Sequence, residues 1–275
     1  MRKIVKIGFQ GESGSYSEIA ASRYFSDIQS EFIPFRSFQD LFDGVENSSL
    51  DSAIVPIENS IEGGVNETYD LLVEKQLFVI GEIYQRIKHC LIANKQSIEI
   101  KTVYSHPQAL AQCRNYIRKK SLEPIPSYDT AGSVKLIKEH FLVNASAIAS
   151  RRAADIYDMK IIEEGIEDKN NNFTRFLVIS KIPNYQNNAD KTSIIFSISH
   201  TPGSLFLILK EFASRNINLT KIESRPTKDV PWEYYFFVDF EGNPNDNVVM
   251  NSLSDIKKGT LFFKILGSYK KAEIS

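Results

Sequence analysis

Short apolar runs alternate with amphipathic stretches along the first two thirds of the chain. Runs such as residues 4–9 and 52–56 have the length and apolar character of buried strands. Residues 65–73 place apolar side chains four and three apart, which is typical of a helix with one buried face. This alternation predicts an α/β domain with a mostly parallel sheet. We expect strands at 4–9, 31–35, 52–56, 77–84, 89–93, 103–105 and 174–179, and helices at 17–25, 38–45, 65–73, 107–120, 131–139 and 150–157.

A polar segment without periodicity, residues 183–191, interrupts this pattern and is expected to be a linker. Beyond it the pattern restarts in the order strand, helix, strand, strand, helix, strand, which predicts a ferredoxin-like βαββαβ domain. We therefore expect a first domain over residues 1–182 and a small second domain over 192–275. The expected strands of the second domain are 192–199, 219–225, 234–240 and 261–266, and its helices are 203–214 and 247–256.

The composition excludes several classes of protein. At roughly 150 residues per domain, a chain of 275 residues suggests two domains, and its 42% hydrophobic content can form packed cores. A net charge of -1 lacks the basic footprint of a nucleic-acid-binding protein. Two cysteines, Cys90 and Cys113, are too few for a disulfide scaffold and indicate reduced thiols. Because neither a signal peptide nor an apolar run of membrane-spanning length is present, we expect a soluble, cytoplasmic protein without membrane partners.

Polar residues and glycines follow the strand expected at 52–56. In α/β sheets, ligands bind beyond the carboxyl ends of strands. Asn59 can donate and accept hydrogen bonds, Ser60 can donate to a carboxylate, and Gly63 lets a ligand approach the backbone. An ordinary turn explains the same residues equally well.

The segment 105–113 combines a helix start with polar side chains. Ser105 stands where an N-cap would, Pro107 suits the first turn, and Gln108 and Gln112 share one helix face. A helix N-terminus favours an anion, so a carboxylate could dock here. The alternative is a capping serine with solvated glutamines.

A third candidate is the segment 170–177, in which Thr174 could hydrogen-bond a leaving hydroxyl and Arg175 could hold a carboxylate bidentately. The four histidines are scattered, and we expect no metal site. There is no P-loop, no dinucleotide-binding fingerprint and no Ser/His/Asp or Cys/His arrangement with supporting spacing.

These segments stand together, in the same order, in prephenate dehydratases, and the chain resembles a monofunctional member of that family over nearly its whole length. The resemblance implies a catalytic half with a type 2 periplasmic-binding fold: two lobes, the second at about 80–160, joined by crossing strands near 77–84 and 159–163, with the cleft between them. The motifs that carry it are Ile7-Gly8-Phe9-Gln10-Gly11-Glu12-Ser13-Gly14-Ser15-Tyr16-Ser17, Pro56-Ile57-Glu58-Asn59-Ser60 with Gly63, Ser105-His106-Pro107-Gln108 with Gln112-Cys113, and Thr174-Arg175-Phe176.

The resemblance implies a carbon–oxygen lyase that removes CO2 and water from prephenate to give phenylpyruvate, without a cofactor. Thr174 is the implied catalytic residue, while Arg175 either holds substrate or braces the loop in an internal ion pair. Asp129 stands where some members carry glutamate. The implied substrate-binding residues are Asn59, Ser60, Gly63, Ser105, Gln112, Thr130, Arg175 and Phe176.

The C-terminal part resembles an ACT domain, which implies allosteric inhibition by phenylalanine at an interface between subunits of a homodimer or homotetramer. Two other functions stay open: an arogenate dehydratase with the same chemistry, and a non-catalytic amino-acid sensor with the same folds. The expected effector-binding residues are Gly203, Ser204, Leu205, Asn218, Leu219, Glu223, Ser224, Arg225 and Pro226.

Overall fold

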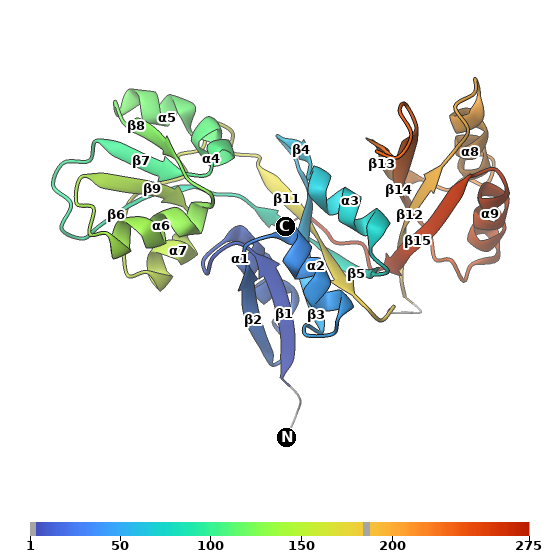
Figure 1. The fold of residues 1–275 in the computed structure, drawn as a ribbon, viewed down its shortest axis with the longest axis horizontal. Coiled ribbons are helices and arrows are strands. Elements are labelled where there is room, and N and C mark those ends of the chain that lie inside the picture. The colour runs from blue at the N-terminus through green and yellow to red at the C-terminus, as the bar shows by residue number, and fades with distance from the viewer. Residues whose placement is uncertain (1–3, 184–187, 275) are drawn as a thin grey trace.

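A computed structural model describes residues 4–183 and 188–274, which form three lobes side by side (Figure 1). The N-terminal lobe lies in the middle, with the second lobe and the C-terminal domain on either side of it. Residues 184–187 of the expected linker 183–191 lie outside the described residues. Lys191 already belongs to a strand, so the linker ends before the position that we predicted.

A mixed sheet with strand order β2-β1-β3-β11-β5 forms the N-terminal lobe. Strands β1, β2 and β3 run parallel, as predicted, but β11 runs antiparallel to both β3 and β5. The mostly parallel sheet that we expected is therefore present only in the first half, because β11 enters from the second lobe. The elements are β1 (Val5–Gln10), α1 (Tyr16–Tyr24), β2 (Ser30–Phe35), α2 (Phe38–Glu46), β3 (Ser52–Asn59), β4 (Gly63–Gly64), α3 (Asn66–Glu74), β5 (Phe78–Arg86) and β11 (Phe173–Ser180).

The second lobe has a sheet of order β10-β6-β9-β7-β8. Our list of expected strands lacked β8 and β9, since β8 contains two prolines and β9 is rich in alanine. The helix expected at 107–120 is divided at Cys113. The elements are β6 (Cys90–Ala93), β7 (Thr102–Ser105), α4 (Pro107–Gln112), α5 (Arg114–Lys119), β8 (Glu123–Pro126), α6 (Thr130–Glu139), β9 (Ala145–Ala149), α7 (Arg151–Ile156) and β10 (Lys160–Glu164).

Two segments connect these lobes. Strand β5 leads out of the first sheet near the crossing expected at 77–84. Residues 159–163 do not form the return crossing, because most of them belong to β10, which pairs with β6 inside the second lobe. The chain returns through residues 165–172 into β11. This two-lobed α/β arrangement is the periplasmic-binding-protein-like fold that the resemblance implies, with a second sheet that starts and ends later than 80–160.

Strand β11 has a different environment on each face, because successive side chains of a strand point in opposite directions. Phe176 and Val178 pack with α1 and β1 in one apolar cluster. Leu177 and Ile179 pack in the other direction, in a cluster with residues of α2 and α3. The second cluster also contains residues of the C-terminal domain, so β11 is a strand of the N-terminal lobe with one face toward that domain.

The C-terminal domain has the predicted βαββαβ order and a four-stranded antiparallel sheet of order β13-β14-β12-β15. Helices α8 and α9 pack on this sheet through a core of their own, which includes Phe212, Phe240 and Leu253. The elements are β12 (Lys191–Ser197), α8 (Ser204–Ala213), β13 (Leu219–Pro226), β14 (Tyr234–Glu241), α9 (Asn247–Lys258) and β15 (Phe262–Tyr269).

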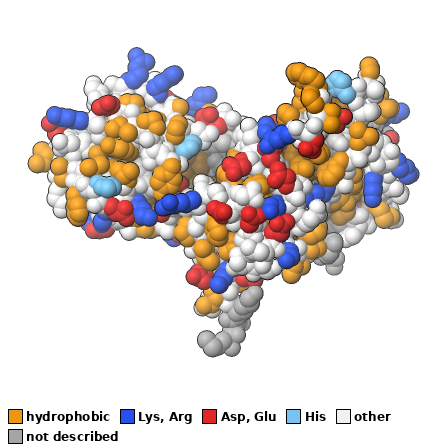
Figure 2. Space-filling view, viewed as in Figure 1, with side chains coloured by type: hydrophobic (Ala, Val, Ile, Leu, Met, Phe, Trp, Pro, Cys, Tyr) orange, Lys and Arg blue, Asp and Glu red, His pale blue; other side chains and the backbone are white. Residues whose placement is uncertain are grey.

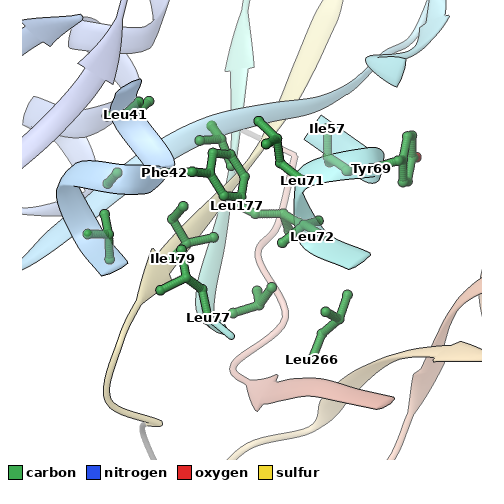
Figure 3. Packing of buried hydrophobic residues seen from close by; sticks show 14 of the residues in the cluster. Leu41, Phe42, Ile57, Tyr69, Leu71, Leu72, Leu77, Leu177, Ile179 and Leu266 are labelled. Carbon is green, nitrogen blue, oxygen red and sulfur yellow. The ribbon is translucent and has the colours of Figure 1, made fainter. Parts of the chain in front are cut away.

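The C-terminal domain is packed against the N-terminal lobe through apolar side chains. Leu266 and Tyr269 of β15 belong to the same buried cluster as Leu77 and Ile179. Figure 3 shows Leu266, Leu77 and Ile179. Gly267 permits the closest approach, since a Cβ at this position would lie 2.0 Å from the carbonyl oxygen of Val79 on β5. A shared core of this kind fixes the domain more firmly than a polar interface would.

Replacing Gly267 by alanine should therefore destabilise the protein by about 2–4 kcal/mol, because the added methyl group would collide with β5 backbone. The midpoint of urea unfolding measures this loss. Gly259→Ala is the matched control, since a Cβ there would come no closer than 3.3 Å to the side-chain end of Ile208. Equal midpoints for the two variants would contradict the proposed close contact.

Candidate active site

A cavity of about 470 Å³ lies between the two lobes of the first domain. The N-terminal lobe supplies the end of β3 and the starts of β11 and α3, while the second lobe supplies α4 and the start of α6. Six of the residues expected to bind substrate or act on it line this cavity: Asn59, Gly63, Gln112, Thr130, Thr174 and Phe176. Segments more than a hundred residues apart in the sequence thus meet at one site.

Thr174 is held at the cavity by a hydrogen bond from its neighbour on β3. Asn59 Nδ2 donates to Thr174 Oγ1 over 2.9 Å. The orientation of the Asn59 amide is fixed, because its Oδ1 accepts bonds from the backbone N–H groups of Ile61 and Glu62. Since Thr174 Oγ1 accepts from Asn59, its own O–H is left to donate to a group in the cavity.

A chain of side-chain amides continues from Asn59 across to the second lobe. Asn59 Nδ2 also donates to Asn172 Oδ1 over 2.7 Å, and Asn172 Nδ2 donates to Gln112 Oε1 over 3.0 Å. His89 Nε2 lies 3.0 Å from the same Gln112 oxygen, which requires the proton on Nε2. Asn172 is fully buried. This chain fixes the Thr174 hydroxyl relative to both lobes.

Most of the described side chains that line the cavity are neutral, and the two acidic ones are Glu62 and Asp129. No arginine or lysine is among the described residues that line it. Burial lowers the pKa of His89 and of His106, which favours their neutral forms. Helix α3 begins at the cavity wall with no side-chain cap on its first N–H groups. An anion in this cavity would therefore be held by amide and backbone N–H groups and by the positive end of α3.

Asp129 lies at the cavity wall as the N-cap of α6, and its Oδ1 accepts a bond from the backbone N–H of Gly132 over 2.7 Å. Burial raises the pKa of this carboxyl group. The carboxylate therefore occupies the positive end of α6, which leaves the start of α3 as the uncapped helix end at the cavity.

Three residues that we expected to contact substrate lie elsewhere. Ser105 is fully buried and donates to the carbonyl of Ile148, and it does not cap α4, whose N-cap is His106. Ser60 is exposed, and its Oγ accepts from the backbone N–H of Phe173. Both serines hold cavity-bearing segments in place without lining the cavity.

Arg175 also lies outside the cavity. It follows Thr174 on β11, so its side chain leaves the opposite face of the sheet. There its Nε donates to Glu82 Oε2 over 2.7 Å, and its Nη1 donates to Asp239 Oδ2 over 2.5 Å. Of the two roles left open for Arg175, the geometry favours the internal ion pair, and its partner Asp239 belongs to the C-terminal domain.

The loop between β1 and α1 joins the two lobes beside the cavity. Glu12 accepts a bond from Tyr128 Oη over 2.8 Å and pairs with Lys135 over 3.0 Å. Gly14 has a φ of 91°, and a Cβ there would lie 2.6 Å from the Cα of Ala153. Gly14 thus lets α7 approach closely, which explains why this position is a glycine. The sequence alone indicates only a turn here.

Comparison with known proteins identifies the family. The family model described as prephenate dehydratase matches residues 7–184, and the ACT domain model matches residues 192–258. The chain belongs to the prephenate dehydratase family. The prephenate dehydratase of Methanocaldococcus jannaschii is 43% identical to this chain, over 93% of this chain and 94% of the relative.

Two further members of the prephenate dehydratase family show how far the similarity extends. The arogenate dehydratase/prephenate dehydratase 2 of Arabidopsis thaliana is 41% identical, over 96% of this chain and 72% of the relative. The crystal structure of the Arthrobacter aurescens prephenate dehydratase in complex with L-Phe superimposes with a TM-score of 0.88 at 31% identity, and the match covers 97% of this chain and 90% of that one.

A second cavity, of about 480 Å³, lies in the ACT domain. Gly203, Ser204 and Leu205 line it, as does Trp232. Helix α8 begins here after Gly203 without a side-chain cap, and although the N–H of Ser204 donates to the carbonyl of Thr201, a helix start of this kind favours a carboxylate. The other expected effector-binding residues do not line this cavity in the single chain: Asn218, Leu219, Glu223, Ser224, Arg225 and Pro226.

Strand β13, which carries most of these remaining residues, contacts the N-terminal lobe. Lys221 pairs with Glu58 over 2.7 Å, and Arg225 lies 3.5 Å from Asp70 on α3. Figure 2 shows acidic and basic side chains gathered where the central lobe meets the ACT domain. Among the described residues, no helix has the length and apolar character of a membrane span, and no group of His, Cys, Asp or Glu side chains is arranged like metal ligands.

Asn172→Ala should lower kcat about 10- to 100-fold with little change in KM, because it removes the link between the Asn59 amide and Gln112. Steady-state kinetics with prephenate as the test substrate measures the effect. Asn171→Ala is the matched control, since the Asn171 side chain is exposed. Equal kcat values for the two variants would exclude a role for the amide chain.

Proposed function

We propose that this chain is a prephenate dehydratase, a carbon–oxygen lyase that converts prephenate to phenylpyruvate with loss of CO2 and water. The observation that carries this proposal is the Thr174 hydroxyl, held by Asn59 with its O–H free to donate into the cavity. Family membership gives the reaction, and the geometry supplies the donor that this reaction requires.

Prephenate carries two carboxylates, and the cavity offers two kinds of donor to them. The uncapped start of α3 presents backbone N–H groups, and Gln112 and Thr130 present polar side chains from the second lobe. Gly63 has a φ of 83° and open space around its Cα, so a carboxylate can approach the backbone there. We assign Ser60, Ser105 and Arg175 to supporting roles, because none of them lines the cavity.

The reaction balances with one proton from solvent and needs no cofactor. As the ring carboxylate leaves as CO2, its bonding electron pair completes the aromatic ring while the C–O bond to the ring hydroxyl breaks. The departing oxygen takes up a proton and leaves as water. An alcohol is a weak acid at neutral pH, so Thr174 acts mainly by stabilising the charge that develops on that oxygen, and solvent supplies the proton.

The ACT domain binds phenylalanine and inhibits turnover in this proposal. The uncapped start of α8 would receive the carboxylate of the amino acid, and the apolar wall around Leu205 and Phe236 would receive its ring. Residues of β13 would complete the site from a second subunit, which implies a homodimer or homotetramer. The Arthrobacter aurescens relative forms a complex with L-Phe, and this supports phenylalanine as the effector.

The domain division in this proposal is a catalytic domain over 1–182 and an ACT domain that begins at Lys191, one residue earlier than predicted. Arogenate dehydratase is the second candidate function, because the Arabidopsis relative carries both names. The initial rates with prephenate and with arogenate decide between the two. The cytoplasmic location stays a prediction from the sequence.

Thr174→Ala should reduce kcat on prephenate by at least about 100-fold with little change in KM, since its bond strengthens as the hydroxyl departs. Thr174→Ser keeps the hydroxyl and should retain most of the activity. The assay follows phenylpyruvate formation at saturating prephenate. A Thr174→Ala enzyme with wild-type kcat, or a wild-type enzyme that does not convert prephenate, would refute the proposed function.

A further inference from the structure

The two neighbouring residues Thr174 and Arg175 connect the cavity with the ACT domain. Thr174 points into the cavity on one face of β11, and Arg175 points toward the ACT domain on the other. Arg175 is only 5% exposed. All three of its nitrogens bond to side chains: Nε to Glu82, Nη1 to Asp239 and Nη2 to Tyr269 Oη over 3.1 Å. A shift of these partners would therefore displace β11 at the residue next to Thr174.

The Arg175 partners form a closed network across the domain boundary. Glu82 of β5 also accepts from Lys191 Nζ of β12 over 2.9 Å, so two cations face two carboxylates. Ser193 Oγ donates to Asp239 Oδ1 over 2.5 Å and lies 2.6 Å from Tyr269 Oη. Because every member is buried, the loss of one partner leaves another charge or donor unsatisfied. The network therefore favours one arrangement of the two domains over intermediate ones.

Charge within the network is maintained despite burial. Burial opposes the charged form of Arg175, but Asp239, Tyr269 and Glu82 raise the pKa of its guanidinium above the ordinary value. Burial and the nearby Arg175 lower the pKa of Lys191. Arg175 thus stays a cation and depends on the carboxylate of Asp239 for its stability.

Two strands of the ACT domain run from the effector cavity to this network. Tyr234 and Phe236 at one end of β14 line the cavity, and Asp239 further along β14 bonds to Arg175. Strand β12 makes the same connection, because Ser193 lies in the network and Ile198 lines the cavity just past the end of β12. The separation along β14 is about 17 Å for five residues of an extended strand. A ligand that moves these strands at the cavity moves Asp239 and Ser193 with them.

Strand β11 can respond to such a movement at the position of Thr174. Its pairing with β3 shifts register between Arg175 and Phe176, where β3 carries the extra residue Ile57, while its pairing with β5 stays in register over the same residues. The ladder on the β3 side is therefore locally irregular beside the catalytic hydroxyl. Irregularities of this kind re-aim side chains next to active sites. A small displacement of Arg175 therefore changes the direction of the Thr174 O–H.

We propose that Arg175 is a positioning residue for Thr174, and that the ACT domain controls catalysis through the Asp239–Arg175 contact. Phenylalanine bound at the ACT domain shifts β12 and β14, moves the Arg175 guanidinium, and turns the Thr174 O–H away from the leaving hydroxyl. This inference rests on the proposed function, because it takes prephenate turnover and phenylalanine binding as given. Such a coupling is reciprocal: bound substrate changes the affinity for phenylalanine by the same factor.

The test uses the full-length Asp239→Asn variant, which keeps the size of the side chain and removes its charge. We expect kcat to fall about 10-fold with KM within about twofold, since Thr174 is misplaced while the donors to the carboxylates are unchanged. We expect the phenylalanine concentration for half-inhibition to rise at least about 10-fold.

Trp232, the only tryptophan of the chain, lies at the effector cavity, so its fluorescence reports phenylalanine binding directly. The dissociation constant for phenylalanine measured by this fluorescence should stay within about threefold of the wild-type value. This is the result expected when the effector still binds but its coupling to catalysis is lost.

Tyr269→Phe is a second, milder variant, because it keeps the ring in its core position and removes only the hydroxyl group. Like Asp239→Asn, it should lower kcat and raise the phenylalanine concentration for half-inhibition. Lys264→Met is the matched control: Lys264 bonds to the carbonyls of Leu72 and Lys75 at the same domain boundary, and neither acceptor belongs to β11. It should keep wild-type kcat and wild-type inhibition.

Three results distinguish the possible failures. Wild-type kcat and inhibition in both Asp239→Asn and Tyr269→Phe would overturn the proposed coupling. Equal loss of inhibition in Lys264→Met would also overturn it, because the coupling would then belong to the whole boundary. A wild-type enzyme that turns over prephenate but ignores phenylalanine would instead refute the proposed regulation.

Discussion

The alternation of side chains along β11 is the constraint on which the rest of the structure depends. A strand can present one residue to a cleft and the next to a neighbouring domain only if it lies between the two. Strand β11 has this position because it pairs with β3 and β5 at the junction of the lobes and packs against the ACT domain on its other face. Thr174 and Arg175 are adjacent in the sequence but serve different parts of the molecule for this reason.

In the proposed function the cavity binds a dianion without a cationic side chain among the described residues that line it. The amides of Asn59, Asn172 and Gln112 order one another and hold the Thr174 hydroxyl, so this donor is in place before a ligand arrives. Preorganised neutral donors cost little reorganisation when charge moves from the ring carboxylate to the leaving oxygen. A lysine or arginine in the same place would hold the ring carboxylate as an anion and oppose its departure as neutral CO2.

Much of this architecture follows from the sequence, because periodicity identifies most helices and strands and the motifs identify the family. The direction of β11 and the formation of β8 as a strand despite its two prolines depend on tertiary contacts, which no local pattern reveals. The role of Asn172 was hidden in a run of three asparagines, of which only one is buried. The partner of Arg175, Asp239, lies 64 residues further along, so the sequence could indicate an internal ion pair for Arg175 but could not name its partner.

In our proposal the ACT domain acts on catalysis through Thr174. The most direct measurement of this claim is a double-mutant cycle in kcat between Thr174→Ala and Asp239→Asn. If Asp239 acts through the Thr174 hydroxyl, its substitution should reduce kcat in the wild-type background and have no further effect once Thr174 is alanine. Losses that multiply independently in the double variant would contradict the account.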